Sequence, residues 1–121
     1  MELKANELRI GNKLLFLGDV VTFKNITEIR EDGIFWIKTF EPKIESKNFH
    51  FKPIPLTEEL ILKYGKNSIF SNGYSYRITK LGRVEILLGV AIITVIDYLH
   101  EFQNLNFALL GCEIEEYEPL Y

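Results

Sequence analysis

Glycine stands singly at eight places in this chain of 121 residues, and this spacing limits what the chain can fold into. Glycine readily adopts positive φ angles, so each one is expected to mark a turn or the end of a helix. The segments between them are therefore short strands and short helices. Because the glycines are dispersed, they do not form the cluster that cradles a phosphate group. The eight are Gly11, Gly18, Gly33, Gly65, Gly73, Gly82, Gly89 and Gly111.

The first fifty residues predict an antiparallel β-meander. After Pro42 a fourth strand is expected over Ile44–Phe51. Alternation along this strand would place Phe49 and Phe51 on one face and His50 on the other. Such short strands would expose their edges as a flat sheet, so we expect them to curl into a small SH3-like barrel. The three strands expected before Pro42 are Leu14–Leu17, Val20–Ile29 and Ile34–Phe40.

A stiff connector and a short helix are predicted next. Pro53 and Pro55 favour extended backbone. Thr57 is a suitable N-cap, the two glutamates that follow it suit the positive end of a helix, and Gly65 is a stop signal. A helix of about two turns is not stable alone, so we expect it to act as a strut between two β-rich parts.

The second β-rich part is predicted from Ser68 onwards. Asn72 and Gly73 favour a type I′ hairpin turn, because both tolerate positive φ. We expect a meander of about four strands, and the near-continuous apolar character of Ile86–Ile93 predicts that it is covered on both faces. The strands expected after the Asn-Gly turn are Tyr74–Lys80, Arg83–Leu88 and Ala91–Val95.

A final helix is predicted from Asp97 or Tyr98 to Leu110, and Gly111 stops it. Asn106 falls within the apolar arc, where we expect a structural role because buried amides find partners within the protein. A short strand is expected over Cys112–Tyr117. The apolar arc comprises Tyr98, Leu99, Phe102, Leu105, Leu109 and Leu110, and the opposite polar face comprises Asp97, His100, Glu101 and Asn104.

Together these elements predict an α+β fold. The SH3-like β lobe is expected over residues 1–52, the connector with its helix over 53–66, and an antiparallel sheet packed on the C-terminal helix over 67–121. We expect the three parts to form one compact unit. The hydrophobic fraction of 47% suffices for a core without metals or cross-links at this size.

The charge is divided unevenly along the chain. All 14 Lys and Arg and 10 acids lie in residues 1–83, which gives 14 − 10 = +4, and the last 38 residues carry seven acids and no Lys or Arg, which gives −7. The simpler interpretation is that the two regions lie side by side and partly neutralise each other. The alternative is a basic surface with an acidic end. A pI near 5.4 argues against strong sequence-independent binding of nucleic acid.

Cysteine content and hydropathy predict a cytoplasmic protein with no membrane segment. Cys112 is the single cysteine, and charges recur through the first thirty residues in place of an apolar signal core. The longest apolar stretch, Val84–Ile96, is shorter than the roughly 20 residues that a membrane-spanning helix needs.

No pattern of catalytic residues is evident, so we expect no catalytic residue, no cofactor and no metal, and classify the chain as not an enzyme. His50, His100 and Cys112, with an acid, could converge on zinc, but they lack the close ligand pairs of such sites. We instead expect surface or capping histidines and a buried thiol. An active site assembled from distant residues would leave no such pattern in the sequence.

Aromatic residues with basic neighbours are how small barrels stack single-stranded nucleic acid. Core packing is the commoner use of such residues. The aromatic residues concerned are Phe35, Trp36, Phe49, Phe51, Tyr74 and Tyr76, with Lys38, Lys47, Lys52 and Arg77 as basic neighbours.

Three segments, KANELRIGN, PIPLTEELILKYG and YLHEFQNLNFALLG, cover about a third of the chain. In these segments the chain resembles a family of small uncharacterised proteins of gut anaerobic bacteria and their prophages and mobile elements. It departs from the family pattern at Asn106, where an aromatic is usual, and at Leu110, where threonine is usual. The resemblance implies an accessory role and carries no activity. His100, Gln103 and Asn104 match its motif.

These observations predict a non-enzymatic, cytoplasmic interaction protein of a phage or mobile element, with another protein as its partner. The alternative is a nucleic-acid-binding module that uses the basic residues 1–83. The candidate interaction surface comprises His100, Gln103, Asn104, Trp36, Tyr74 and Tyr76.

Overall fold

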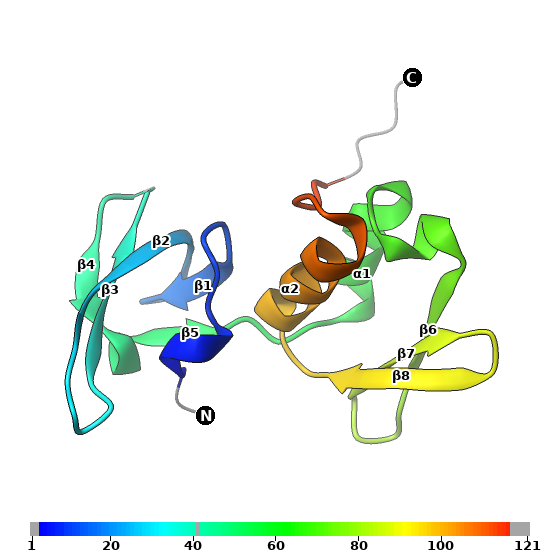
Figure 1. Ribbon diagram of the computed structural model, residues 1–121, viewed down its shortest axis with the longest axis horizontal. Helices are drawn as coiled ribbons and strands as arrows, with labels where there is room; N and C mark the ends of the chain where they lie inside the picture. Colours follow the sequence, from blue (N-terminus) through cyan, green and yellow to red (C-terminus); the bar gives the residue numbers. More distant parts are fainter. Residues whose placement is uncertain (1–2, 41, 117–121) are drawn as a thin grey trace. The chain divides into compact units, whose positions relative to one another are not determined.

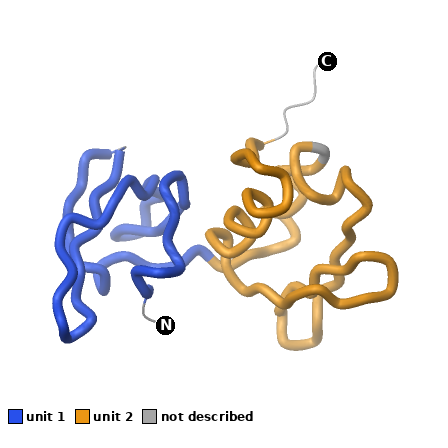
Figure 2. The backbone as a smooth tube through the Cα atoms, viewed as in Figure 1, with its two compact units in different colours: residues 1–54 blue, residues 55–121 orange. Residues whose placement is uncertain are grey.

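The computed structural model describes residues 3–40 and 42–116, and it has an α+β fold with two antiparallel sheets. The chain divides into two compact units, residues 1–54 (unit 1) and residues 55–121 (unit 2), as Figure 2 shows. The short helix predicted as a connector belongs to unit 2. Each unit is described by itself.

Unit 1 is a five-stranded antiparallel sheet in the order β4-β3-β2-β1-β5 (Figure 1). The long strand β2 pairs with β1 on one side and β3 on the other, and its pairing with β3 contains two register shifts. The three strands predicted before Pro42 are confirmed to within a residue or two. The elements are η1 (Ala5–Glu7), β1 (Lys13–Phe16), β2 (Asp19–Ile29), β3 (Phe35–Thr39), β4 (Glu45–Lys47), η2 (Asn48–His50) and β5 (Phe51–Pro53).

The prediction of one strand over Ile44–Phe51 is wrong, because the 3-10 turn η2 divides it into β4 and β5. The buried Asn48 holds this turn: its Oδ1 accepts from the Phe35 N–H at 3.2 Å and its Nδ2 donates to the Leu3 carbonyl at 3.4 Å. The turn also separates two phenylalanines that alternation had placed on one face. Phe51 is buried, whereas Phe49 is 45% exposed.

The core of unit 1 is apolar and is drawn from its strands and the segment before them. The core comprises Leu3, Leu14, Val21, Phe23, Phe35, Ile37 and Phe51.

Unit 2 combines a three-stranded antiparallel sheet, in the order β6-β7-β8, with two helices that lie on one side of it in Figure 1. The predicted N-cap is confirmed: Thr57 Oγ1 accepts from the Leu60 N–H at 3.3 Å, and Gly65 ends the helix with a φ of 39°. The elements are α1 (Glu58–Tyr64), η3 (Gly65–Asn67), η4 (Ile69–Asn72), β6 (Tyr74–Ile78), β7 (Val84–Leu88), β8 (Ala91–Ile96) and α2 (Leu99–Leu110).

The hairpin predicted at Asn72 and Gly73 is wrong, and the sheet has three strands instead of four. Residues before the turn form the 3-10 helix η4, which Gly73 ends in the left-handed region with a φ of 89°. Two side chains hold that helix. Ser68 Oγ accepts from the Phe70 N–H at 3.4 Å, and Asn106 Oδ1 accepts from the Ile69 N–H at 2.8 Å.

Only one face of the three-stranded sheet is covered by described residues, so the expectation of cover on both faces is wrong. Val84, Ile86 and Ile96 are buried on the covered face. The apolar residues around the β7–β8 turn are instead exposed. They follow a register shift between Ile86 and Leu87, which interrupts the regular pairing of β7 with β8. These exposed residues are Leu88, Val90, Ile92 and Ile93.

Helix α2 buries a different stripe from the one that hydropathy predicted. His100 was expected on the polar face and is fully buried, whereas Leu109 was expected in the apolar arc and is 42% exposed. The buried stripe of the helix includes polar side chains. One of them is His100, whose imidazole stacks flat on the Tyr98 ring with 5.9 Å between the ring centroids. The buried residues of α2 are Leu99, His100, Phe102, Gln103 and Asn106.

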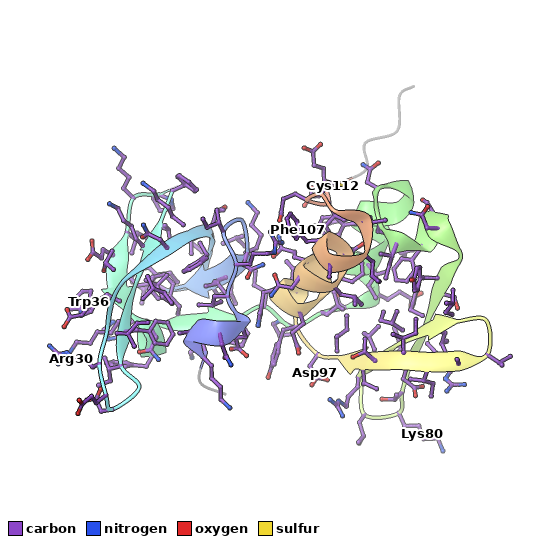
Figure 3. The ribbon with its side chains drawn as sticks, in the orientation of Figure 1. Arg30, Trp36, Lys80, Asp97, Phe107 and Cys112 are labelled. Carbon is purple, nitrogen blue, oxygen red and sulfur yellow. The ribbon has the colours of Figure 1, made fainter. Side chains whose placement is uncertain are left out.

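The structural role predicted for Asn106 is confirmed. Its Nδ2 donates to the Phe102 carbonyl at 2.7 Å, so both ends of the amide are engaged. The strand predicted over Cys112–Tyr117 is wrong for residues 112–116, which form no strand, and Tyr117 lies outside the described residues. Cys112 is exposed, contrary to the expected buried thiol, and Figure 3 places it just past the end of α2.

Candidate functional site

An apolar groove of about 420 Å³ lies in unit 2 between α1, η4 and β6. Tyr74 and Tyr76 lie two residues apart on β6, so their side chains leave the strand on the same face. The residues that line this aromatic groove are Ile61, Leu62, Gly65, Phe70, Ser71, Tyr74, Ser75 and Tyr76.

The wall of the aromatic groove is anchored in the core of unit 2. The Phe70 ring lies 5.2 Å from the Tyr76 ring and 5.7 Å from the ring of the fully buried Phe102. Phe102 in turn contacts Tyr64 at 5.9 Å. Because these rings hold one another, the groove is preformed instead of being a gap between mobile side chains.

One end of the groove carries a polar group. The Tyr76 hydroxyl donates to Glu58 Oε1 at 3.2 Å, and Glu58 opens α1. Burial, followed by the hydrogen bond to Glu58 and its negative charge, raises the pKa of Tyr76 above its ordinary value. The hydroxyl therefore stays protonated at neutral pH and can donate its hydrogen bond to Glu58 beside an apolar surface.

The outer edge of β6 borders the same groove. Among the described strands, β6 pairs only with β7, so its other edge is open. Figure 1 shows this strand at the margin of the sheet.

A second concave site, of about 370 Å³, lies in unit 1 around three lysines and an exposed phenylalanine. The Nζ of Lys24 lies 5.2 Å from the centre of the Phe40 ring, and Phe40 is 48% exposed. The buried Thr39 shapes the loop, since its Oγ1 accepts from the Ile44 N–H at 3.1 Å. This lysine pocket is lined by Lys24, Lys38, Thr39, Phe40, Lys43, Ile44 and Glu45.

The six predicted interaction residues do not form one surface. Tyr74 and Tyr76 share the aromatic groove. Trp36 belongs to unit 1, where it lies half-buried on β3 opposite Lys47 and points away from the sheet in Figure 3. The three residues on α2 are inaccessible or partly so: His100 and Gln103 are buried, and Asn104 is half-buried.

Sequence reasoning missed three residues that shape these sites. Phe70 was included in the β-rich part expected from Ser68 onwards, and Leu62 was assigned no role, although it is exposed and lines the groove. Phe40 was treated as the end of a strand. The β2–β3 pairing brings Lys24 close to Lys38, and Lys43 joins them from the loop after β3.

Within residues 3–40 and 42–116, no three His, Cys, Asp or Glu side chains gather closely enough to hold a metal ion. His50 lies in unit 1, where its Nδ1 is 2.6 Å from the Ser46 hydroxyl. His100 and Cys112 lie in unit 2, one buried on α2 and the other exposed beyond it.

Two ion pairs join the basic and acidic parts of the sequence across the boundary at residue 83. Arg77 Nε lies 2.7 Å from Glu85 Oε1, and Arg83 forms two contacts with Asp97, at 2.8 and 3.1 Å. For these two arginines the structure shows the neutralisation that the uneven charge predicted. The arginines of unit 2 therefore add little to any basic surface.

Comparisons with family models, with curated proteins and with solved structures found no match. In the part of the chain that the structure describes, no helix has the length and apolar character needed to cross a membrane.

Proposed function

We propose that the protein is a non-enzymatic interaction module whose partner, another protein, binds in the aromatic groove of unit 2. The observation that carries this proposal is a preformed groove lined by Phe70, Tyr74 and Tyr76 beside an open strand edge. Aromatic anchors in a desolvated pocket supply most of the binding energy of protein interfaces.

The chemistry of the groove favours binding over catalysis. Apolar and aromatic side chains dominate it, and its ionisable groups are the hydroxyls of Tyr74 and Tyr76 and the adjacent carboxyl of Glu58. A tyrosine with a raised pKa, hydrogen-bonded to one carboxylate, provides neither a nucleophile with its base nor an electrophilic centre. It does provide an oriented polar group at the rim of an apolar surface, as binding sites use.

We further propose that unit 1 is an SH3-like scaffold. Its support is the strand order, in which β1 pairs with both β2 and β5, together with a long β2 shared between two parts of the sheet. The resemblance in the three sequence segments supports a cytoplasmic accessory role in a phage or mobile element. Neither role requires a cofactor.

Panning a random-peptide display library against the immobilised full-length chain tests the proposed function. We expect enriched peptides to lose at least about tenfold in affinity for Tyr76→Ala, because one aromatic anchor is worth more than 1 kcal/mol. Phe49→Ala, which removes an exposed ring from unit 1, is the matched control and should bind normally. Failure to enrich any peptide, or equal loss in both variants, would contradict the proposal.

The lysine pocket favours a second function, the binding of single-stranded nucleic acid by unit 1. Phe40 offers a ring for base stacking, and Lys24, Lys38 and Lys43 surround it with positive charge. A titration with labelled oligothymidine in low salt tests this function. Binding should weaken steeply with salt and be lost in Phe40→Ala but not in Lys80→Ala, whose lysine is exposed in the β6–β7 turn. Equal binding by both variants would exclude the pocket.

A further inference from the structure

We infer that the partner enters as an extended segment that adds a strand to the open edge of β6, with a basic side chain next to Glu58. This inference rests on the proposed function and names the chemistry of its ligand. Strand addition combines main-chain hydrogen bonds, which supply affinity, with pockets for alternate side chains, which supply specificity.

The hydrogen-bond pattern of the β6–β7 hairpin fixes which backbone groups face the open edge. The Thr79 N–H donates to the Arg83 carbonyl at 2.8 Å, so this pair is hydrogen-bonded. Bonded and non-bonded pairs alternate along an antiparallel ladder. Arg77 and Ser75 therefore face β7, and the N–H and C=O groups of Tyr74, Tyr76 and Ile78 face outward. Three residues at two-residue intervals match the repeat of an incoming strand.

The other sheet edges of the molecule are poorer templates. In unit 1, β4 and β5 have three residues each, and β5 ends in Pro53, which has no N–H to donate. In unit 2, β8 is longer but carries no aromatic residue, and its pairing with β7 contains a register shift. β6 pairs with β7 without a register shift and contains no proline.

Side-chain alternation links the open edge to the aromatic groove. Tyr74 and Tyr76 are the residues whose backbone faces outward, and their rings line the groove. An added strand would place every second side chain on the groove side, next to Phe70 and Leu62. These side chains are expected to be apolar, because the facing walls are apolar.

The negative charge of unit 2 favours a basic partner segment. Residues 55–121 hold five Lys and Arg and nine Asp and Glu, which gives 5 − 9 = −4. Glu58 and Glu59 are exposed at the start of α1, and Glu58 is bonded to the Tyr76 hydroxyl at the groove. Arg77, the one cation on β6, is paired with Glu85 at 2.7 Å, so it does not repel a basic ligand. An extended segment with a Lys or Arg at the Glu58 end complements this surface.

The test uses the full-length chain and a synthetic copy of the most enriched display peptide. Two N-methylated versions are compared, each methylated on one of the two alternate sets of amides. In strand addition one set of amides bonds to β6 and the other faces solvent. One version should therefore lose at least about tenfold in affinity while the other keeps it. Equal affinities for both versions, with the Tyr76→Ala effect intact, would overturn strand addition and leave the proposed function standing.

A matched pair of lysine substitutions tests the charge and the location. Leu62→Lys places a cation on an exposed position of the groove, and Leu81→Lys makes the same change in the β6–β7 turn. Only Leu62→Lys should weaken the peptide, by about tenfold, with its thermal midpoint unchanged. Equal effects would overturn the inference. So would sedimentation showing a stable dimer that the peptide dissociates, because a second copy would then occupy the edge.

Discussion

The two units differ in the edge strands of their sheets. Unit 1 ends its five-stranded sheet in two strands of three residues, one of which finishes with Pro53. Unit 2 leaves β6, a strand of five residues, open next to the aromatic groove. A short or proline-ended edge resists pairing with another chain, and an unprotected edge invites it. Under the proposed function, main-chain recognition belongs to unit 2, and unit 1 is left with side-chain recognition through its lysine pocket.

The aromatic residues allow the two units to be followed separately. The single tryptophan, Trp36, lies in unit 1, and all six tyrosines lie in residues 55–121. Tryptophan emission therefore reports on unit 1, and the near-ultraviolet tyrosine signal reports on unit 2. A change in one unit can thus be compared with a matched change in the other.

The largest expected effect comes from the two cores. Phe102→Ala removes a fully buried ring that contacts Tyr64 and Phe70, and it should destabilise unit 2 by about 3–5 kcal/mol. Urea unfolding followed by both signals is the measurement. We expect the tyrosine signal to be lost at low urea while the Trp36 transition is unchanged.

The matched change in unit 1 is Ile37→Ala, which empties a fully buried position on β3. It should shift the Trp36 transition by about 2–5 kcal/mol and leave the tyrosine transition in place. A shift of both transitions by either variant would show that the two cores unfold together, against the division into two units.

The next largest losses of stability are expected on replacing the buried amides that hold irregular backbone in each unit. Asn106 makes hydrogen bonds of 2.8 and 2.7 Å, whereas those of Asn48 are 3.2 and 3.4 Å. Replacing either with alanine leaves a backbone group without its partner, at a cost of about 1–3 kcal/mol. Urea midpoints should show the larger loss for Asn106→Ala. A larger loss for Asn48→Ala would reverse the ranking.

Most strands and helix ends could be predicted from the sequence, but the 3-10 turns η2 and η4 could not. The helix ends at Gly65 and Gly111 and the cap at Thr57 could be predicted because their sequence signals are local. The 3-10 turns η2 and η4 lie where strands were expected, since they depend on hydrogen bonds that join the amides of Asn48 and Asn106 to backbone groups 13 to 45 residues away in the chain.

The candidate sites were predictable only in part, for a related reason. Tyr74 and Tyr76 were named because they are aromatic residues with a basic neighbour, Arg77. The rest of the groove depends on η4 folding where a hairpin was expected. His100 was misplaced because an imidazole counts as polar in a hydropathy pattern, although its faces pack against rings such as that of Tyr98.

Alkaline pH should affect unit 2 selectively. Burial, and then the charges of Glu116 and Glu113, raise the pKa of Tyr64 above its ordinary value of 10.0. The folded state therefore favours the neutral phenol. Its contribution to stability is present below about pH 10 and is lost as the pH rises through the folded-state pKa. Thermal midpoints of the tyrosine signal should fall as the pH rises above about 10.

Tyr64→Phe is the control, because it keeps the ring and removes the titrating group. The thermal midpoint of Tyr64→Phe should fall less over the same pH range. The Trp36 transition of the unmodified chain should not show this fall. An identical pH profile for Tyr64→Phe and the unmodified chain would contradict the assignment.

The smallest effects are expected from surface ion pairs. Arg83 meets Asp97 with two contacts, at 2.8 and 3.1 Å, while Arg30 meets Glu28 with one at 3.4 Å. All four side chains are at least one third exposed, so Arg83→Ala should lower the urea midpoint only slightly and Arg30→Ala less still. Urea midpoints in about 1 M salt should nearly erase the difference. A loss as large as that of Asn106→Ala in either variant would show a structural role.

We propose main-chain recognition by unit 2 at the edge of β6, and residue-resolved amide hydrogen exchange is the measurement that decides it. With the display-selected peptide bound, exchange at Tyr76 and Ile78 should slow by at least about tenfold, because hydrogen-bonded amides exchange only after opening. Exchange at Ser75 and Arg77, which already bond to β7, should change little. Unchanged exchange at Tyr76 and Ile78 in the saturated complex, or protection confined to residues 1–54, would contradict the account.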